Sequence, residues 1–243
     1  MRTPALLTLL ACALASHGAS AQQAPVPPTV PRLQSRLEVA IDALDRDVAK
    51  AAEALGEKGL IGPEARGVLR DLCARHAGCV DCTAVDAKGV MRAVEPEAYR
   101  KFEGSDISGQ EQVRRLQQTR KPVLSAAFRA VEGIDAVDLE HPVLSPSGEV
   151  LGSVSALVEA QELLAQACGK AAEQAGFEVW VLQTDGRILY GTRRDSIGKN
   201  LFTDERFTAF PSVAQMGRQL ADQYEGSAAY EFAEKGQKPV FIL

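Results

Sequence analysis

The chain has 243 residues and a net charge of −5, from 27 Lys and Arg against 32 Asp and Glu. Apolar residues make up 46% and charged residues 24%, which is typical of a soluble globular protein and excludes a collagen-like or broadly disordered chain. Nucleic-acid binding favours clustered Lys and Arg, so the acidic balance argues against a nucleic-acid partner. The length allows one large domain or two of about 100 residues.

Residues 1–21 have the pattern of a secretory signal peptide. Arg2 supplies a positive charge, residues 4–16 are largely apolar, and residues 19–21 (Ala-Ser-Ala) form a small-x-small cleavage site. The apolar run is shorter than the ~20 residues of a membrane-spanning helix, which disfavours an uncleaved anchor. A lipoprotein attached through Cys12 is a second alternative. We expect an exported protein, periplasmic or secreted, that starts near Gln22.

The segments that follow alternate between linker, helix and strand. Residues 22–31 hold four prolines and no charge, which predicts a semi-rigid linker. Apolar residues at three- and four-residue steps then predict a helix from Arg32, and Pro63 suits the first turn of a second helix that ends near Ala74. Alternation and turn residues predict strands over 80–85, 90–94, 122–131, 134–143 and 149–158. Residues 96–119 read as polar and mostly helical, with Ser108 as a helix cap and Glu111 three residues on.

The second half of the chain repeats this order. It reads as a helix over 159–175 ended by Gly176, strands over 178–183 and 187–190, a polar helical region to Tyr224, and strands over 227–232 and 239–243. Internal repetition of a whole unit predicts two tandem modules, 32–158 and 159–243. The fold class is α+β, with an antiparallel sheet and a helical lid in each module.

Several short motifs follow one another along the first half of the chain. They are Asp86-Ala87-Lys88-Gly89, Tyr99, residues 104–108 (GSDIS), residues 121–128 (KPVLSAAF), His141-Pro142-Val143 and residues 148–152 (GEVLG). The second half matches with residues 179–190 (VWVLQTDGRILY) and 197–202 (IGKNLF). Together they resemble the extracytoplasmic Cache (PAS-like) sensor family in its double-module form, over residues 35–243.

The resemblance implies a non-enzymatic sensor that binds a small molecule, needs no cofactor and acts with a membrane-bound signalling partner. Relatives usually continue into a transmembrane helix and a cytoplasmic domain, whereas this chain stops and its second module looks one strand short. We therefore expect a free-standing exported binding protein. The alternatives are a scaffold that dimerises through the helix over 32–50, giving a homodimer, and a metal or redox protein centred on cysteines.

A sheet covered by a helical lid offers a concave ligand site in the first module. The expected ligand-binding residues are Tyr99, Ser125, Phe128, Arg129 and Asp138. Arg129 could hold a carboxylate through a bidentate pair. A one-residue change of register would exchange Phe128 and Arg129, and each candidate also has a structural interpretation as core, solvated or anchoring residue. No amino-acid-binding signature is evident, and Asp86, Gly89, Asp185 and Gly186 suit turn geometry.

Four cysteines follow the predicted cleavage site: Cys73, Cys79, Cys82 and Cys168. An even count in an exported chain favours disulfides, with Cys73 paired to Cys79 or Cys82 and Cys168 to the remaining thiol. The alternative is a metal site made by Cys73, His76, Cys79 and Cys82, whose spacing could hold zinc or an iron–sulfur cluster. An oxidising compartment weighs against metal. Covalent haem, a thioredoxin-like motif and a serine hydrolase using His76 or His141 are not indicated.

Overall fold

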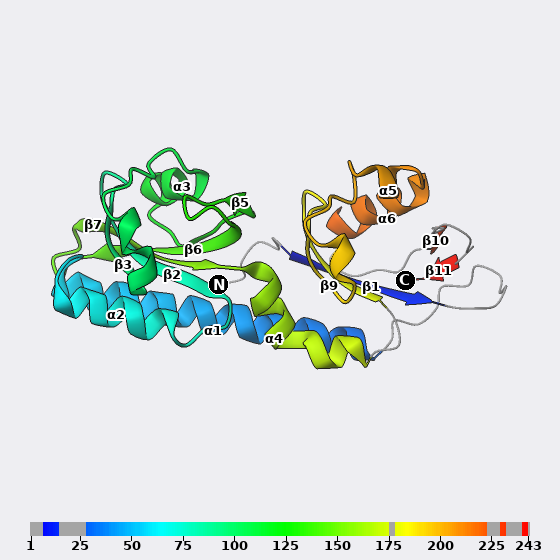
Figure 1. Ribbon diagram of the computed structural model, residues 1–243, viewed down its shortest axis with the longest axis horizontal. Helices are drawn as coiled ribbons and strands as arrows, with labels where there is room; N and C mark the ends of the chain where they lie inside the picture. Colours follow the sequence, from blue (N-terminus) through cyan, green and yellow to red (C-terminus); the bar gives the residue numbers. More distant parts are fainter. Residues whose placement is uncertain (1–6, 15–27, 175–177, 223–228, 232–239, 243) are drawn as a thin grey trace. The chain divides into compact units, whose positions relative to one another are not determined.

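The computed structural model describes residues 7–14, 28–174, 178–222, 229–231 and 240–242. They divide into two compact units (Figure 1). The central unit comprises residues 39–163, and the terminal unit comprises the described residues within 1–38 and 164–243. Each unit contains its own antiparallel sheet.

The central unit is a sheet with helices on one side and a helix with loops on the other. Its elements are α1 (Thr29–Lys58, from residue 39 on), α2 (Pro63–Cys73), β2 (Cys79–Asp86), β3 (Met91–Glu95), η1 (Glu97–Phe102), α3 (Glu111–Thr119), β4 (Val123–Leu124), β5 (Phe128–Arg129), β6 (Asp135–Leu144) and β7 (Val150–Val158). The strand order is β3-β2-β7-β6-β4, and β5 pairs with the first two residues of β6.

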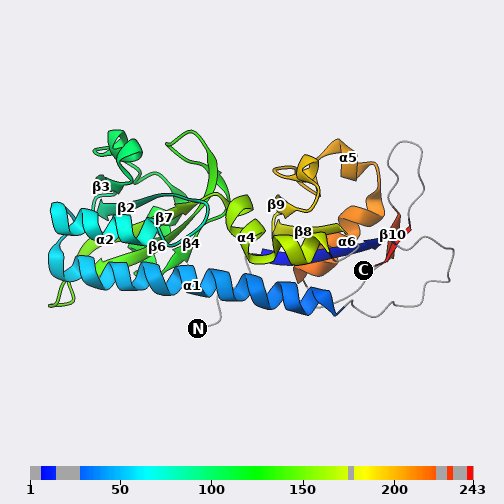
Figure 2. The same ribbon diagram turned by 60° about the horizontal axis from the view of Figure 1, so that its bottom comes forward.

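The two faces of this sheet differ because side chains alternate along each strand. The helix face carries Val137, Leu139, Val154, Ala156 and their neighbours, which pack against buried leucines of α1 and α2 (Figure 2). The opposite face lies under α3, whose Gln112 reaches β6. We call it the polar face, because several of its buried side chains are acids and alcohols.

Glycine is required where β7 approaches β2. Gly152 has a φ of +152° and lies directly against the Val85 carbonyl oxygen and the backbone of Asp86. A Cβ atom at this position would overlap that oxygen, so only glycine permits the close pairing of the two strands here.

The terminal unit has the second sheet, in the order β10-β11-β1-β8-β9. Its elements are β1 (Leu7–Leu14), the first ten residues of α1, most of α4 (Ala160–Glu173), β8 (Glu178–Gln183), β9 (Ile188–Gly191), η2 (Arg194–Ser196), α5 (Glu205–Thr208), α6 (Pro211–Asp222), β10 (Ala229–Glu231) and β11 (Val240–Ile242). Trp180 and Phe207 meet edge to face with ring centroids 5.6 Å apart, which fixes α5 on β8.

The structure confirms the turn roles of the two aspartates and corrects several boundaries. Asp86 Oδ1 accepts from the backbone N–H groups of Lys88 and Val90, and Asp185 Oδ1 accepts from that of Arg187. The expected strand over 122–131 is two separate short strands, because Ser125 bonds with the Asp138 backbone and the chain then leaves the ladder. The cap of α3 is Gln110, so the expectation of Ser108 was wrong.

Two elements of the structure lie where the sequence predicted a linker and a signal peptide. Helix α1 begins at Thr29, inside the linker expected over 22–31, because Pro31 is tolerated in the first turn of a helix. Strand β1 lies within the predicted signal peptide and pairs with β8 and β11. Gly176 and parts of the last expected strands lie outside the described residues. Within those residues, no helix is both long and apolar enough to cross a membrane.

We predict that Gly152→Ala destabilises the protein by roughly 1–3 kcal/mol, because the new methyl group must displace the Val85 carbonyl. Gly67→Ala is the matched control: Gly67 lies inside α2, where an added Cβ meets nothing within 4 Å, so alanine should stabilise by up to about 1 kcal/mol. The midpoint of urea unfolding measures both changes. Equal effects of the two substitutions would contradict the close β2–β7 approach.

Candidate functional site

The polar face of the central unit is lined by two cross-strand rows. Asp81 of β2, Leu157 of β7 and Asp138 of β6 stand opposite one another in the first row. The second row consists of Thr83, Ser155 and Glu140 on the same three strands. Seven polar side chains on this face are 5% exposed or less: Asp81, Thr83, Ser125, Asp138, Glu140, Ser153 and Ser155. Gln112, which lies above the face on α3, is equally buried.

Each of the three acids is hydrogen-bonded through one carboxyl oxygen only. Asp81 Oδ1 accepts from Thr83 Oγ1 at 2.9 Å, and Glu140 Oε1 accepts from the Ser153 hydroxyl. Asp138 Oδ2 has a long contact, 3.5 Å, with Gln112 Nε2. The second oxygen of each group, Oδ2 of Asp81, Oδ1 of Asp138 and Oε2 of Glu140, is buried without a partner. Buried polar atoms are normally satisfied, so three orphans on one face require an explanation.

Burial raises the pKa of all three carboxyl groups. Desolvation, with the charge of Glu140 second, raises the pKa of Asp138 to about 8. Desolvation likewise raises the pKa of Asp81 to about 8 and that of Glu140 to about 7. Among the described residues, no basic side chain forms an ion pair with any of the three. Within the described part of the chain, the polar face is therefore a buried set of acids without a basic side chain paired to it.

The structure distributes the five expected ligand-binding residues over three places. Ser125 and Asp138 lie together on the polar face, where the Asp138 N–H donates to Ser125 Oγ at 2.8 Å. Tyr99 and Phe128 are half-buried and both pack against the apolar cluster that contains Leu157 of the first row. Arg129 is on the surface, 69% exposed, and its Nη1 lies 3.3 Å from Asp135 Oδ1.

The sequence reasoning missed most of the polar face. Asp81, Glu140, Thr83, Gln112, Ser153 and Ser155 were not among the expected site residues. A signal was present, because Asp81 and Thr83, Asp138 and Glu140, and Ser153 and Ser155 are each two residues apart within apolar strands. Residues two apart on a strand share a face, so the three pairs mark one polar surface.

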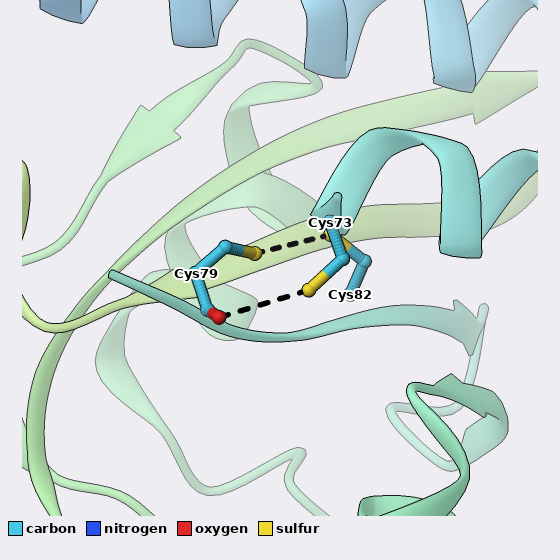
Figure 3. Close-up of side chains that lie close together, drawn as sticks. All are labelled: Cys73, Cys79 and Cys82. Atoms are coloured by element: carbon cyan, nitrogen blue, oxygen red, sulfur yellow. Dashed lines mark hydrogen bonds between the residues drawn. The ribbon is translucent and has the colours of Figure 1, made fainter. Parts of the chain in front are cut away.

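Three of the four cysteines gather on the helix face of the same sheet (Figure 3). Cys73 ends α2, and Cys79 and Cys82 lie on β2. The Cys79 and Cys82 Sγ atoms are 3.6 Å apart, and all three Sγ atoms lie within 4.8 Å of one another. Cys168 is separate: it is buried in α4 and donates to the Leu164 carbonyl at 2.9 Å. All four are thiols here, and the disulfide pairing stays a prediction.

Both histidines of the described chain face acids of α1. His141 Nε2 lies 2.8 Å from Asp45 Oδ1, and His76 Nε2 lies 3.2 Å from Asp47 Oδ2. His76 is not one of the residues whose ligand atoms cluster with the thiols. These contacts connect β6 and the end of α2 to α1.

Comparison with solved structures identifies the class of fold. An extracellular ligand-binding receptor from Desulfohalobium retbaense is 32% identical, with a TM-score of 0.69. The match covers 86% of this chain but only 38% of that receptor. The ligand-binding domain of the Campylobacter jejuni chemoreceptor Tlp3, in complex with 4-methylisoleucine, matches at 9% identity and a TM-score of 0.60, covering 87% of this chain and 81% of that one.

A third structure has the same fold. The ligand-binding domain of the Pseudomonas aeruginosa amino acid chemoreceptor PctC, in complex with GABA, matches at 12% identity and a TM-score of 0.56, with 88% of this chain and 94% of that chain covered. The fold is thus that of extracellular Cache-type sensor domains. The model of the HK/GC/chemotaxis protein-like sensor domain family matches residues 39–160, and the chain belongs to this family. A search of curated proteins found no match to this chain.

We predict that Asp138→Asn stabilises the ligand-free protein at pH 8 by at least about 1 kcal/mol, or roughly 2–4 °C in Tm. Because the pKa of Asp138 is about 8 in the folded protein and ~3.9 in an unfolded chain, stability is lost from about pH 4 up to pH 8, whereas Asn does not titrate. At pH 5 the folded Asp138 is neutral and only the unfolded chain carries the ionised carboxyl, so the difference should be clearly smaller than at pH 8. Thermal unfolding at the two pH values measures this.

Asp135→Asn is the matched control, because Asp135 lies on the same strand with a side chain 51% exposed. It should change stability by less than about 1 kcal/mol at either pH. A destabilised Asp138→Asn protein at pH 8 would contradict the conclusion that burial of this carboxyl costs stability.

Proposed function

We propose that this protein is an exported sensor that binds a small molecule carrying a protonated amine on the polar face of the central unit. The observation that carries the proposal is the set of three buried carboxyls, each with an unpartnered oxygen and none with a basic partner. The proposed ligand-binding residues are Asp138, Glu140 and Asp81 for the amine, with Ser125 and Gln112 orienting Asp138.

The chemistry of an ammonium group suits this surface. It has three N–H donors and a positive charge, and three carboxyl oxygens here lack donors. Hydrogen bonds between ionised partners are shorter and roughly twice as strong as neutral ones. A bound cation would also favour the ionised form of each acid and so offset the cost of burying the charge. Anionic ligands have no such complement among the described groups of this face.

The relatives support the same ligand class. The structures of Tlp3 and PctC contain 4-methylisoleucine and GABA, and both compounds carry an amino group. Tyr99 and Phe128, which pack beside the first row, would contact the apolar part of such a ligand.

The two units would then be the tandem modules expected from the sequence, with binding in the first. With residues 1–21 removed on export, the second module would lose β1, which lies between β11 and β8 in the described sheet. The resemblance to receptors supports a membrane-bound signalling partner, with export directed by residues 1–21. The helix over 32–50 is the proposed surface for a homodimer.

A thermal-shift screen tests the ligand class. We predict that one or more amines, at about 100 times their dissociation constant, stabilise the protein by ~2.7 kcal/mol, or roughly 5–10 °C, whereas carboxylates without an amine do not. Asp138→Asn and Glu140→Gln should reduce the shift, and Asp135→Asn should keep it. A shift from anionic compounds alone would contradict the proposal, and no shift from any class would favour a scaffold.

The affinity for the amine should rise with pH between 6 and 8. Asp138, with a pKa of about 8, and Glu140, with a pKa of about 7, must lose protons to pair with the cation. Each proton lost contributes up to about tenfold in affinity per pH unit below its pKa. Titration calorimetry at several pH values measures the trend, and an affinity that falls over this range would contradict it. Glu140→Gln should flatten the trend near pH 7.

A further inference from the structure

We propose that Cys73, Cys79 and Cys82 bind one thiolate-seeking d10 metal ion, zinc(II) or copper(I), through their three sulfurs. This site lies on the helix face of the sheet and is separate from the proposed ligand site. Thiolates are the protein ligands that these two ions share, so the donor set defines the class of ion.

The local backbone brings the three thiols together. In a regular strand, Cys79 and Cys82 would point to opposite faces, because they are three residues apart. However, Cys79 pairs with Val158 and Asp81 pairs with Leu157, so β2 has an extra residue at Val80. This bulge places Cys79 on the helix face with Cys82. Cys73 reaches the same point from the end of α2, where its thiol contacts the Cys79 carbonyl at 3.8 Å (Figure 3).

The spacing of the sulfurs fits a shared ion. With metal–sulfur bonds of ~2.3 Å, sulfurs are about 3.8 Å apart around a tetrahedral ion and about 4.0 Å apart around a trigonal one. The observed separations are 3.6 Å for Cys79 and Cys82 and at most 4.8 Å for the other pairs. Movements of less than about 1 Å would give either geometry. One ion uses all three thiols, whereas a disulfide uses two and leaves the third unpaired.

The burial of the three thiols also suits an ion. Cys82 is fully buried against the core of α1 and α2, whereas Cys73 and Cys79 are half-buried and give an ion access. Zinc(II) with three thiolates would keep one tetrahedral position for water.

An ion bound by the three thiols would connect the end of α2 to β2, the strand that carries Asp81. Asp81 lies between Cys79 and Cys82 on β2 but faces the opposite side of the sheet. An ion on the helix face would therefore hold the backbone on which one acid of the polar face is built.

The test uses the full chain, purified with reductant and exposed separately to zinc(II) and to copper(I). Elemental analysis and thiol titration should find about one ion per chain and three protected thiols. Cys73→Ser, Cys79→Ser and Cys82→Ser should each lose the ion. Cys168→Ser is the matched control, since that thiol is outside the cluster, and it should keep the ion. Competition between the two ions identifies the preferred one.

Cobalt(II) provides a readout that needs no variant, because thiolate ligands give intense sulfur-to-cobalt charge-transfer absorption that carboxylate and water ligands do not. The wild-type protein should show this absorption, and added zinc(II) should remove it. Wild-type protein with all thiols reduced, freely titratable and unaffected by either ion would overturn the proposal. So would a disulfide within the three in exported protein that, once reduced, still binds no ion.

Discussion

The alternation of side chains along β2, β6 and β7 is the constraint on which the rest of the central unit depends. It sends valine, leucine and alanine to the helices on one face and acids and alcohols to the other. The helix face supplies the apolar burial that stabilises the unit. The polar face can then keep three acids out of water with unpartnered oxygens, at a cost in stability that a ligand would offset.

The bulge at Val80 gives β2 its two roles. Without the extra residue, Cys79 would lie on the same face as Asp81, and the three thiols could not meet. With it, the strand presents Cys79 and Cys82 to α2 and Asp81 and Thr83 to the polar face. A single irregularity of pairing therefore separates a thiol cluster from an acid cluster that overlap in sequence.

The sequence was informative where structure is local. The Asp-Gly turns, the second helix from Pro63 and the α+β class with Cache motifs could be predicted, because turn residues, proline and periodicity act over a few positions. Of the expected site residues, Ser125 and Asp138 are neighbours in the structure. The two-residue spacing of the polar pairs was the only signal for the rest of the polar face, and it could not show which strands are paired. The thiol cluster depends on a bulge, and a bulge has no local signature in residues 79–82.

The central claim is that the acids of the polar face exchange protons for a ligand cation. Calorimetry of the amine found in the screen, at pH 7 in two buffers of different ionisation enthalpy, counts the protons released on binding. The account predicts net release of roughly one to two protons, because Asp81 and Asp138 are largely protonated and Glu140 is half protonated before the ligand arrives, and less release in Asp138→Asn. Binding of the amine with no proton release, or with proton uptake, would contradict it.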